Sequence, residues 1–234
     1  MYNVHTLKAP FNMMVSGPTQ SGKTTLVKKL MRFAPDMIDR PPRKIVYCYG
    51  SEWQDTFDTM HDVVDDFIEG IPQRETSDLF PPDARPGLIV LDDLMNDVKD
   101  SDRVVKLFTK GTHHCDVNAI YIAQNPFPGG KHGRTMSLNT HYNILTKNPR
   151  DCLGVETLFR QIFPRKGREA MDAYNQAVDR PYGYLFIDQH QTTPDAIRLQ
   201  TCIFPDEAPR ECYILDESKV PEAYLNPAAI KKRK

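Results

Sequence analysis

The sequence lacks a long apolar run, a cysteine motif and a large net charge of either sign. Its uncharged apolar stretches are shorter than the roughly 18 residues that a membrane-spanning helix needs, so we expect no membrane partner. The five cysteines are scattered and form no C-x-x-C pair, which argues against a disulfide framework or a zinc site. His113 and His114 beside Cys115 have no second ligand pair at zinc-site spacing. These absences favour a protein with reduced thiols and no structural metal.

Internal repeats and low-complexity tracts are also absent, and 40% of the 234 residues are hydrophobic. This composition suits one globular domain with one core and excludes disorder as the main state. The net charge of −1 conceals an asymmetry, because residues 52–102 carry fifteen Asp or Glu and three Lys or Arg. Residues 1–51 and 103–234 are both basic. Charge alone permits a basic rim for a polyanion, and it equally permits ordinary solvated faces.

Strand and helix patterns alternate along the chain. Apolar runs predict strands at 10–17, 44–50, 87–94, 117–124 and 141–148, and helical spacing predicts helices at 23–34, 101–114, 151–163 and 168–179. Continuous apolar strands separated by helices indicate an α/β fold with a mostly parallel sheet covered on both faces. Residues 182–189 and 196–204 predict a C-terminal antiparallel hairpin. We expect one domain over 1–206 and a flexible basic tail over 207–234.

The strongest motif is a full match to G-x-x-x-x-G-K-[ST], placed between a predicted strand and a predicted helix. Glycines let such a loop turn its N–H groups toward phosphate oxygens. The lysine reaches the β and γ phosphates and the following hydroxyl binds Mg²⁺. The predicted ATP-binding residues are Gly17, Pro18, Thr19, Gln20, Ser21, Gly22, Lys23, Thr24 and Thr25, with Lys23 catalytic and Thr24 a ligand of Mg²⁺.

Polar residues at the ends of two further apolar strands supply the remaining chemistry. Asp92 ends the run 88–92, where ligands bind in open parallel sheets, and is the second expected Mg²⁺ residue. Asp93 is placed to orient or deprotonate an attacking water, although a helix cap or loop acid is the alternative. Gln124 ends the run 117–124 and is a candidate for contacting the γ phosphate or the water. A polar strand cap is an equally good interpretation of Gln124.

Several basic residues allow two interpretations. Arg134 and Arg150 lie in predicted loops, where either could serve a neighbouring subunit's γ phosphate or form a salt bridge or DNA-backbone contact. A basic group at Arg160, Arg165, Lys166 and Arg168 suits phosphate contact, but also an ordinary helix surface. The last four residues, 231–234, suit a nuclear signal, a nucleic-acid tail or a solubilising end.

Four blocks of the sequence together resemble a known family. They are FNMMVSGPTQSGKTTLVKKL, LIVLDDL, THHCDVNAIYIAQNPF and SLNTHYNILTKNPRD. The chain resembles the genome-packaging ATPases of double-stranded DNA viruses, in the FtsK–HerA branch of P-loop NTPases, and particularly those of Maverick/Polinton elements and related animal viruses. The likeness covers roughly residues 10–206. The later blocks are more specific than the phosphate loop, which many families share.

The resemblance implies a RecA-like central sheet, ATP and Mg²⁺ as cofactors, and ATP hydrolysis that moves double-stranded DNA into a preformed capsid. It implies that residues 17–25 bind ATP and Mg²⁺, that Asp92 and Asp93 are the metal and catalytic acids, and that Gln124 is the polar sensor. It also implies a homo-oligomeric ring, a pentamer or hexamer, in which an adjacent copy supplies an arginine; this favours Arg150 over Arg134.

The expected partners are duplex DNA and a capsid or portal-like protein, with no membrane. The expected location is the host nucleus, a cytoplasmic assembly site or the virion. Two rival functions stay open at this point. One is a P-loop nucleotide kinase, although no compact arginine-rich lid is evident. The other is a nucleotide-dependent switch that binds a capsid partner. The lack of an N-K-x-D signature disfavours a small GTPase.

Overall fold

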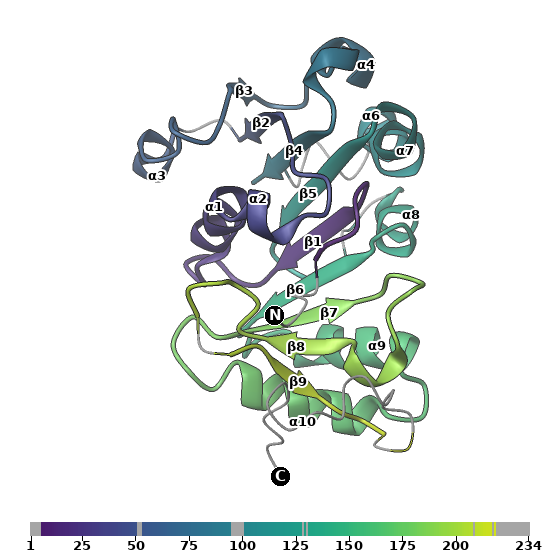
Figure 1. The fold of residues 1–234 in the computed structure, drawn as a ribbon. Helices are drawn as coiled ribbons and strands as arrows, with labels where there is room; N and C mark the ends of the chain where they lie inside the picture. Colours follow the sequence, from purple (N-terminus) through teal and green to yellow (C-terminus); the bar gives the residue numbers. More distant parts are fainter. Residues whose placement is uncertain are drawn as a thin grey trace.

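A single mixed sheet organises the molecule, with helices on both of its faces (Figure 1). The computed structural model describes residues 6–50, 53–94, 101–127, 129, 131–207, 209–216 and 218. Within that part of the chain the strand order is β3-β2-β4-β5-β1-β6-β7-β8-β9. The strand β1 therefore lies in the middle of the sheet, with β5, β4, β2 and β3 to one side and β6 to β9 to the other.

The first six strands are parallel and the last three are antiparallel to their neighbours. Because parallel strands end at one edge of a sheet, residues that follow β1, β4, β5 and β6 meet there. The strands are β1 (Asn12–Ser16), β2 (Lys44–Tyr49), β3 (Asp66–Glu69), β4 (Gly87–Asp92), β5 (Val117–Ala123), β6 (Tyr142–Thr146), β7 (Tyr184–Asp188), β8 (Leu199–Thr201) and β9 (Glu211–Tyr213).

The helices divide between the two faces of the sheet (Figure 1). One face carries α1 (Lys23–Arg32), α2 (Ala34–Met37) and α3 (Asp55–Asp58). The other carries α4 (Thr76–Leu79), α6 (Asp102–Lys106), the π-helical turn η2 (Leu107–Gly111), α7 (Thr112–Cys115), α8 (Gly133–Leu138), α9 (Cys152–Ile162) and α10 (Gly167–Ala177). Two short 3-10 turns, η1 (Pro82–Ala84) and η3 (Asp195–Ile197), complete the described helical segments.

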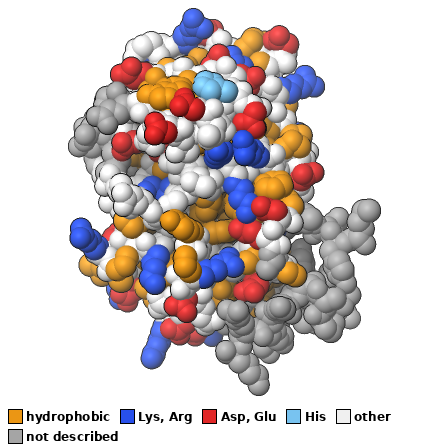
Figure 2. Space-filling model, turned by 90° about the vertical axis from the view of Figure 1, so that its left-hand side faces the viewer, with side chains coloured by type: hydrophobic (Ala, Val, Ile, Leu, Met, Phe, Trp, Pro, Cys, Tyr) orange, Lys and Arg blue, Asp and Glu red, His pale blue; other side chains and the backbone are white. Residues whose placement is uncertain are grey.

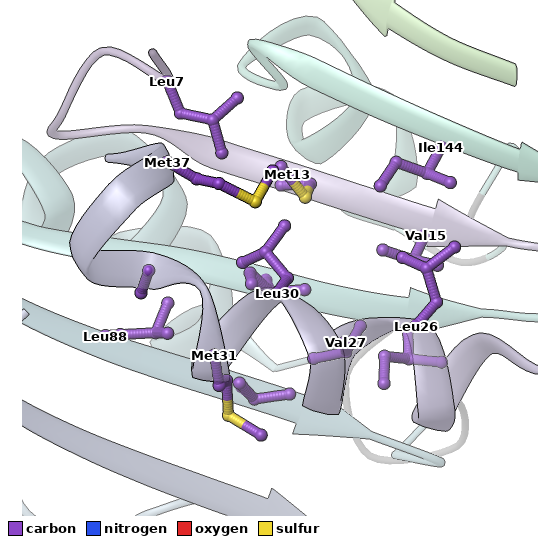
Figure 3. Packing of buried hydrophobic residues seen from close by; sticks show 14 of the residues in the cluster. Leu7, Met13, Val15, Leu26, Val27, Leu30, Met31, Met37, Leu88 and Ile144 are labelled. Carbon is purple, nitrogen blue, oxygen red and sulfur yellow. The ribbon is translucent and has the colours of Figure 1, made fainter. Parts of the chain in front are cut away.

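Alternate side chains of the central strand enter two separate cores. Met13 and Val15 of β1 pack with the α1 face, whereas Met14 packs with the face that α6 and η2 cover. Figure 3 shows Leu30 and Val27 of α1 pointing toward β1, and both are fully buried. Because β1 is covered on both sides, its end is a rigid point from which the next loop begins.

The α/β class, the mostly parallel sheet and the C-terminal hairpin are confirmed. Sequence analysis missed β3, which lies within the acidic segment 52–85, because this four-residue edge strand has only two apolar side chains. The helix expected over 101–114 contains the π-helical turn η2. The glycine-rich segment 126–134 is not a loop throughout, because α8 begins at Gly133; Pro128 and Gly130 lie outside the described residues.

The sheet also continues beyond the expected boundary at residue 206. Strand β9 pairs with β8, with Gln200 opposite Cys212, so residues 211–213 belong to the domain rather than to a tail. The sheet extends to β9 because this pairing gives hydrogen-bond partners to the backbone groups on the outer side of β8. Residues 219–234, including the basic end 231–234, lie outside the described residues. None of the helices in the described ranges is both long and apolar enough to cross a membrane.

Candidate functional site

The phosphate loop follows β1 and leads into α1, as the sequence predicts. Its first glycine is needed because there is no room for a side chain at this position. The N–H of Gly17 donates to the carbonyl of Ala123 at 3.3 Å, and a Cβ at Gly17 would lie 1.8 Å from Oγ1 of Thr146. The φ of 155° at Gly17 also suits glycine better than other residues. The loop can therefore pass between β5 and β6 only with glycine at this position.

Gly22 ends the loop and caps α1 in a left-handed conformation, with a φ of 87°. The first N–H groups of a helix have no partner within it and carry a partial positive charge. The first turn of α1, all of it described, contains no acidic residue that would compete for them. The start of α1 is consequently suited to bind an anion such as a phosphate.

Lys23 is folded back onto its own loop. Its Nζ donates to the carbonyl oxygen of Pro18 at 2.7 Å. Burial lowers the pKa of Lys23, and the negative charges of Asp92 and Asp93 oppose that effect. The ammonium group therefore lies in the low-dielectric site where it would attract phosphate oxygens strongly.

Asp92 is buried at the end of β4, with 4% of its surface exposed. One of its oxygens, Oδ2, accepts hydrogen bonds from the Tyr47 hydroxyl at 2.6 Å and from Thr24 Oγ1 at 3.0 Å. Burial raises the pKa of Asp92, and these two hydrogen bonds act in the opposite direction. The carboxylate thus joins β4, β2 and the start of α1.

Asp93 and Gln124 follow β4 and β5, and both are exposed to the cavity described below. Asp93 has a φ of 53°, which turns the chain away from the strand direction directly after Asp92. Neighbouring carboxylates consequently have different environments: Asp92 is buried among hydroxyl groups, and Asp93 faces solvent. Asp93 can therefore contact water or a ligand in the cavity, whereas Asp92 is held in place by its two hydrogen bonds.

These residues surround a cavity of about 430 Å³. That volume falls within the usual range for small-molecule sites. Gly17, Pro18 and Ser21 of the loop are not among the described lining residues of this cavity. The lining consists of Thr19, Gln20, Gly22, Lys23, Thr24, Thr25, Gln54, Thr56, Asp92, Asp93, Ile122, Ala123, Gln124 and Tyr182.

Arginine is absent from the described lining of this cavity. Arg150 is exposed in the turn before α9, where its N–H donates to Asn148 Oδ1 at 3.2 Å. Arg134 is exposed on α8. The structure thus brings the phosphate loop, both aspartates and Gln124 together and leaves both candidate arginines outside the cavity.

The residues present suit Mg²⁺ in combination with a nucleotide. Thr24 Oγ1 and the Asp92 carboxylate are oxygen donors 3.0 Å apart, and magnesium prefers oxygen ligands. Within the described ranges no group of three or more His, Cys, Asp or Glu is arranged to hold a metal alone. Magnesium bound by one or two protein oxygens takes its other ligands from substrate phosphates and water.

Several residues of the site were not predicted from the sequence, among them Tyr47, Thr146, Gln54 and Tyr182. Tyr47 lies in the middle of β2, where an aromatic residue is expected to be part of the hydrophobic core. Thr146 Oγ1 is hydrogen-bonded to Ser21 Oγ at 2.8 Å and supports the loop. As a polar residue ending an apolar strand, Thr146 carried the same signal as Gln124. Gln54 and Tyr182 lie in segments without a recognisable motif.

Two solved structures of viral NTPases are similar to this architecture. The genome-packaging NTPase B204 of Sulfolobus turreted icosahedral virus 2, in complex with AMP, has a TM-score of 0.51 and 13% identity, covering 82% of this chain and 96% of B204. The B204 DNA-packaging ATPase of Sulfolobus turreted icosahedral virus has a TM-score of 0.50 and 14% identity, covering 80% and 96%. The fold is that of a P-loop NTPase. No protein-family model and no curated protein sequence matches the chain.

We expect Gly17→Ala to damage both stability and nucleotide binding. The added Cβ would collide with Thr146, so the loop must move or the site must strain, at a cost of about 1–3 kcal/mol. Urea unfolding and titration with an ATP analogue measure the two effects. Gly129→Ala is the matched control, because a Cβ there meets nothing within 4 Å. Equal stability and equal binding in both variants would contradict the tight passage at Gly17.

We expect Tyr47→Phe to weaken Mg²⁺-dependent nucleotide binding about tenfold, because it removes a hydrogen bond to a charged, buried carboxylate. Nucleotide binding in excess EDTA should stay unchanged. Titrations with a non-hydrolysable ATP analogue, with and without Mg²⁺, separate the two cases. Tyr142→Phe is the control, since its hydroxyl accepts from the N–H of Lys8 away from the site. A wild-type dependence on Mg²⁺ in Tyr47→Phe would show that Tyr47 does not support the metal site.

Proposed function

We propose that this chain is an ATPase that hydrolyses ATP with Mg²⁺ and uses the energy to move double-stranded viral DNA into a preformed capsid. The observation that carries the proposal is the cavity in which the phosphate loop, Asp92, Asp93 and Gln124 meet at one edge of the sheet. The likeness in fold to B204, a genome-packaging NTPase, supports DNA packaging as the process that the hydrolysis serves. The four sequence blocks that resemble packaging ATPases support the same process.

The charges in the cavity fit phosphoryl transfer to water. The γ phosphate would lie against Lys23 and the start of α1, where N–H groups and an ammonium offset its negative charge. Thr24 and Asp92 are the residues that would hold Mg²⁺, which would supply positive charge to offset the negative charge of the phosphates.

Asp93 and Gln124, the two exposed polar residues, would bind and activate the attacking water. Asp93 would accept a proton from the water that attacks the γ phosphorus, and Gln124 would orient that water. The γ phosphate then leaves as inorganic phosphate, with ADP as the second product. A protein carboxylate or amide in these positions needs access to the cavity, and both side chains line it.

The missing arginine supports an active assembly of several copies. Transition-state charge on the γ phosphate is usually stabilised by an arginine, which a neighbouring molecule often provides. Because the described lining contains none, we propose a pentameric or hexameric ring in which an adjacent copy inserts Arg150, or alternatively Arg134. A capsid or portal-like partner, and a site of action in the host nucleus, at a cytoplasmic assembly site or with the virion, belong to the same proposal.

Two of the four basic residues near α9 and α10 already have acidic partners. Arg160 pairs with Glu156 at 2.6 Å, and Lys166 pairs with Glu169 at 3.4 Å. Arg165 and Arg168 are exposed. We therefore favour Arg165 and Arg168 over the other two as contacts to DNA phosphates. The acidic segment that contains α3, β3 and α4 is unfavourable for DNA. Figure 2 shows several Asp and Glu side chains around a hydrophobic patch in the upper part of the face that α1 and α3 cover.

The proposal predicts ATP hydrolysis that long duplex DNA stimulates. Steady-state phosphate release at low salt, with and without DNA, measures this for the wild type and for Asp93→Asn. Asp93→Asn should lose at least 100-fold in turnover, because general-base catalysis contributes about 10²–10⁴-fold. Asp172→Asn, an exposed change on α10 away from the cavity, is the control and should behave as wild type.

Each rival function has a different result in this assay. Hydrolysis that is slow and indifferent to DNA contradicts translocation and favours a nucleotide-dependent switch. Phosphate transfer to an added nucleoside monophosphate, with little release to water, favours a kinase. Undiminished turnover in Asp93→Asn would remove Asp93 from the mechanism and leave the nucleotide site in place.

A further inference from the structure

Tyr182 is an aromatic residue whose side chain is exposed to solvent and not buried in a core. With 77% of its surface exposed, it is the most exposed large hydrophobic residue in the described part of the chain. It lies two residues before the start of β7, and it lines the same cavity as the phosphate loop. Its ring passes over Gly22, where a Cβ would meet Cδ1 of Tyr182 at 3.0 Å. The last glycine of the phosphate loop thus makes room for this ring.

The backbone at Tyr182 adopts a conformation that suits glycine. Residues 180–183 form a turn in which the N–H of Gly183 donates to the carbonyl of Arg180 at 3.0 Å. Pro181 holds the second position and Tyr182 the third, with a φ of 56°. Turns with proline second and a positive φ third usually have glycine or asparagine there. A bulky aromatic residue in this conformation is a true outlier, and such outliers concentrate at functional sites.

Packing of the Tyr182 side chain does not explain its unfavourable backbone conformation. Tyr182 belongs to none of the three described hydrophobic clusters. Among the hydrogen bonds of the described residues, none involves its hydroxyl. The unfavourable backbone is therefore offset neither by burial nor by a polar contact of the phenol within the described chain. A ligand in the cavity is the remaining partner for the ring.

The turn that carries the ring is firmly attached. The Arg180 guanidinium donates to Cys202 Sγ at 3.0 Å and to Thr201 Oγ1 at 3.4 Å. Gly183 lies so close to α10 that a Cβ there would be 2.4 Å from the carbonyl oxygen of Ala177. These contacts join the turn to α10 and to the end of β8. The backbone that carries the ring is consequently held in place before a ligand arrives, which reduces the entropy lost on binding.

The sheet order places Tyr182 on the opposite side of β1 from the catalytic groups. Asp92, Asp93 and Gln124 follow β4 and β5, on one side of β1, whereas Tyr182 precedes β7, on the other. A triphosphate whose γ phosphate faces the acidic side would extend its nucleoside toward β6 and β7. The aromatic ring would then meet the base and not the phosphates.

We propose that Tyr182 forms the base-binding subsite, with its ring stacked on the base of the bound nucleoside triphosphate. The inference rests on the proposed function, because it requires the phosphates at Lys23. A flat, sequence-tolerant stacking contact favours purines over pyrimidines through their larger rings. Trp53 is the rival platform, but it is not among the described cavity lining, and its ring already contacts Phe57, Phe67 and His61.

Calorimetric titration of the full chain with AMPPCP and with inorganic tripolyphosphate, which has no base, tests the subsite. Tyr182→Ala should weaken AMPPCP binding about tenfold and leave tripolyphosphate binding unchanged, since base stacking contributes roughly that much affinity. Tyr182→Phe keeps the ring and should bind both ligands as wild type does. Trp53→Ala is the matched aromatic control and should also leave both affinities unchanged. In steady-state assays Tyr182→Ala should raise KM for ATP more than it lowers kcat.

Three results would overturn the subsite. Equal AMPPCP affinity in Tyr182→Ala and wild type would show that the ring does not touch the base. An equal loss for AMPPCP and tripolyphosphate would make Tyr182 a support of the phosphate loop. Both leave the proposed ATPase intact, because wild type still binds the analogue. A wild-type chain that binds neither ligand would instead remove the nucleotide site, and the subsite with it.

Discussion

The site depends on one buried carboxylate. Asp92 is almost fully enclosed, yet its Oδ2 holds a hydroxyl from β2 and a hydroxyl from the start of α1 at the same time. An unpaired buried charge would be costly, so Tyr47 and Thr24 must stay in place for the fold as well as for the chemistry. Burial and the charge of Asp92 together raise the pKa of Tyr47, which keeps its hydroxyl a donor. The carboxylate therefore fixes the position of the phosphate loop relative to the strands that carry Asp93 and Gln124.

The central position of β1 gives the cavity two different sides. Toward β5 and β4 the cavity is lined by acidic and amide side chains, which suit a metal ion and an attacking water. Toward β6 and β7 it is lined by the exposed ring of Tyr182. A ligand with a charged end and an aromatic end matches this division. Nucleoside triphosphates have that shape, with phosphates at one end and a flat base at the other.

Much of this arrangement follows from local sequence patterns. Long apolar runs predict β1, β4 and β5, because strands covered on both faces need apolar residues throughout. The phosphate loop is predicted because its glycines and lysine are adjacent in sequence. Tyr47 and Tyr182 are different, since their roles arise from contacts with residues 45 and 160 positions away. The edge strand β3 was missed for a related reason: its sequence is short and half-exposed, and its pairing with β2 joins residues about twenty positions apart.

A crystal structure of the chain with Mg²⁺ and AMPPCP would show most directly whether the cavity binds a nucleotide. We expect Lys23 to leave the carbonyl of Pro18 and to contact the β and γ phosphates. We also expect Mg²⁺ beside Thr24 Oγ1, within reach of Asp92 directly or through one water. An analogue bound elsewhere on the molecule, or phosphates in the cavity with Lys23 still on Pro18 and no metal near Asp92, would contradict these expectations.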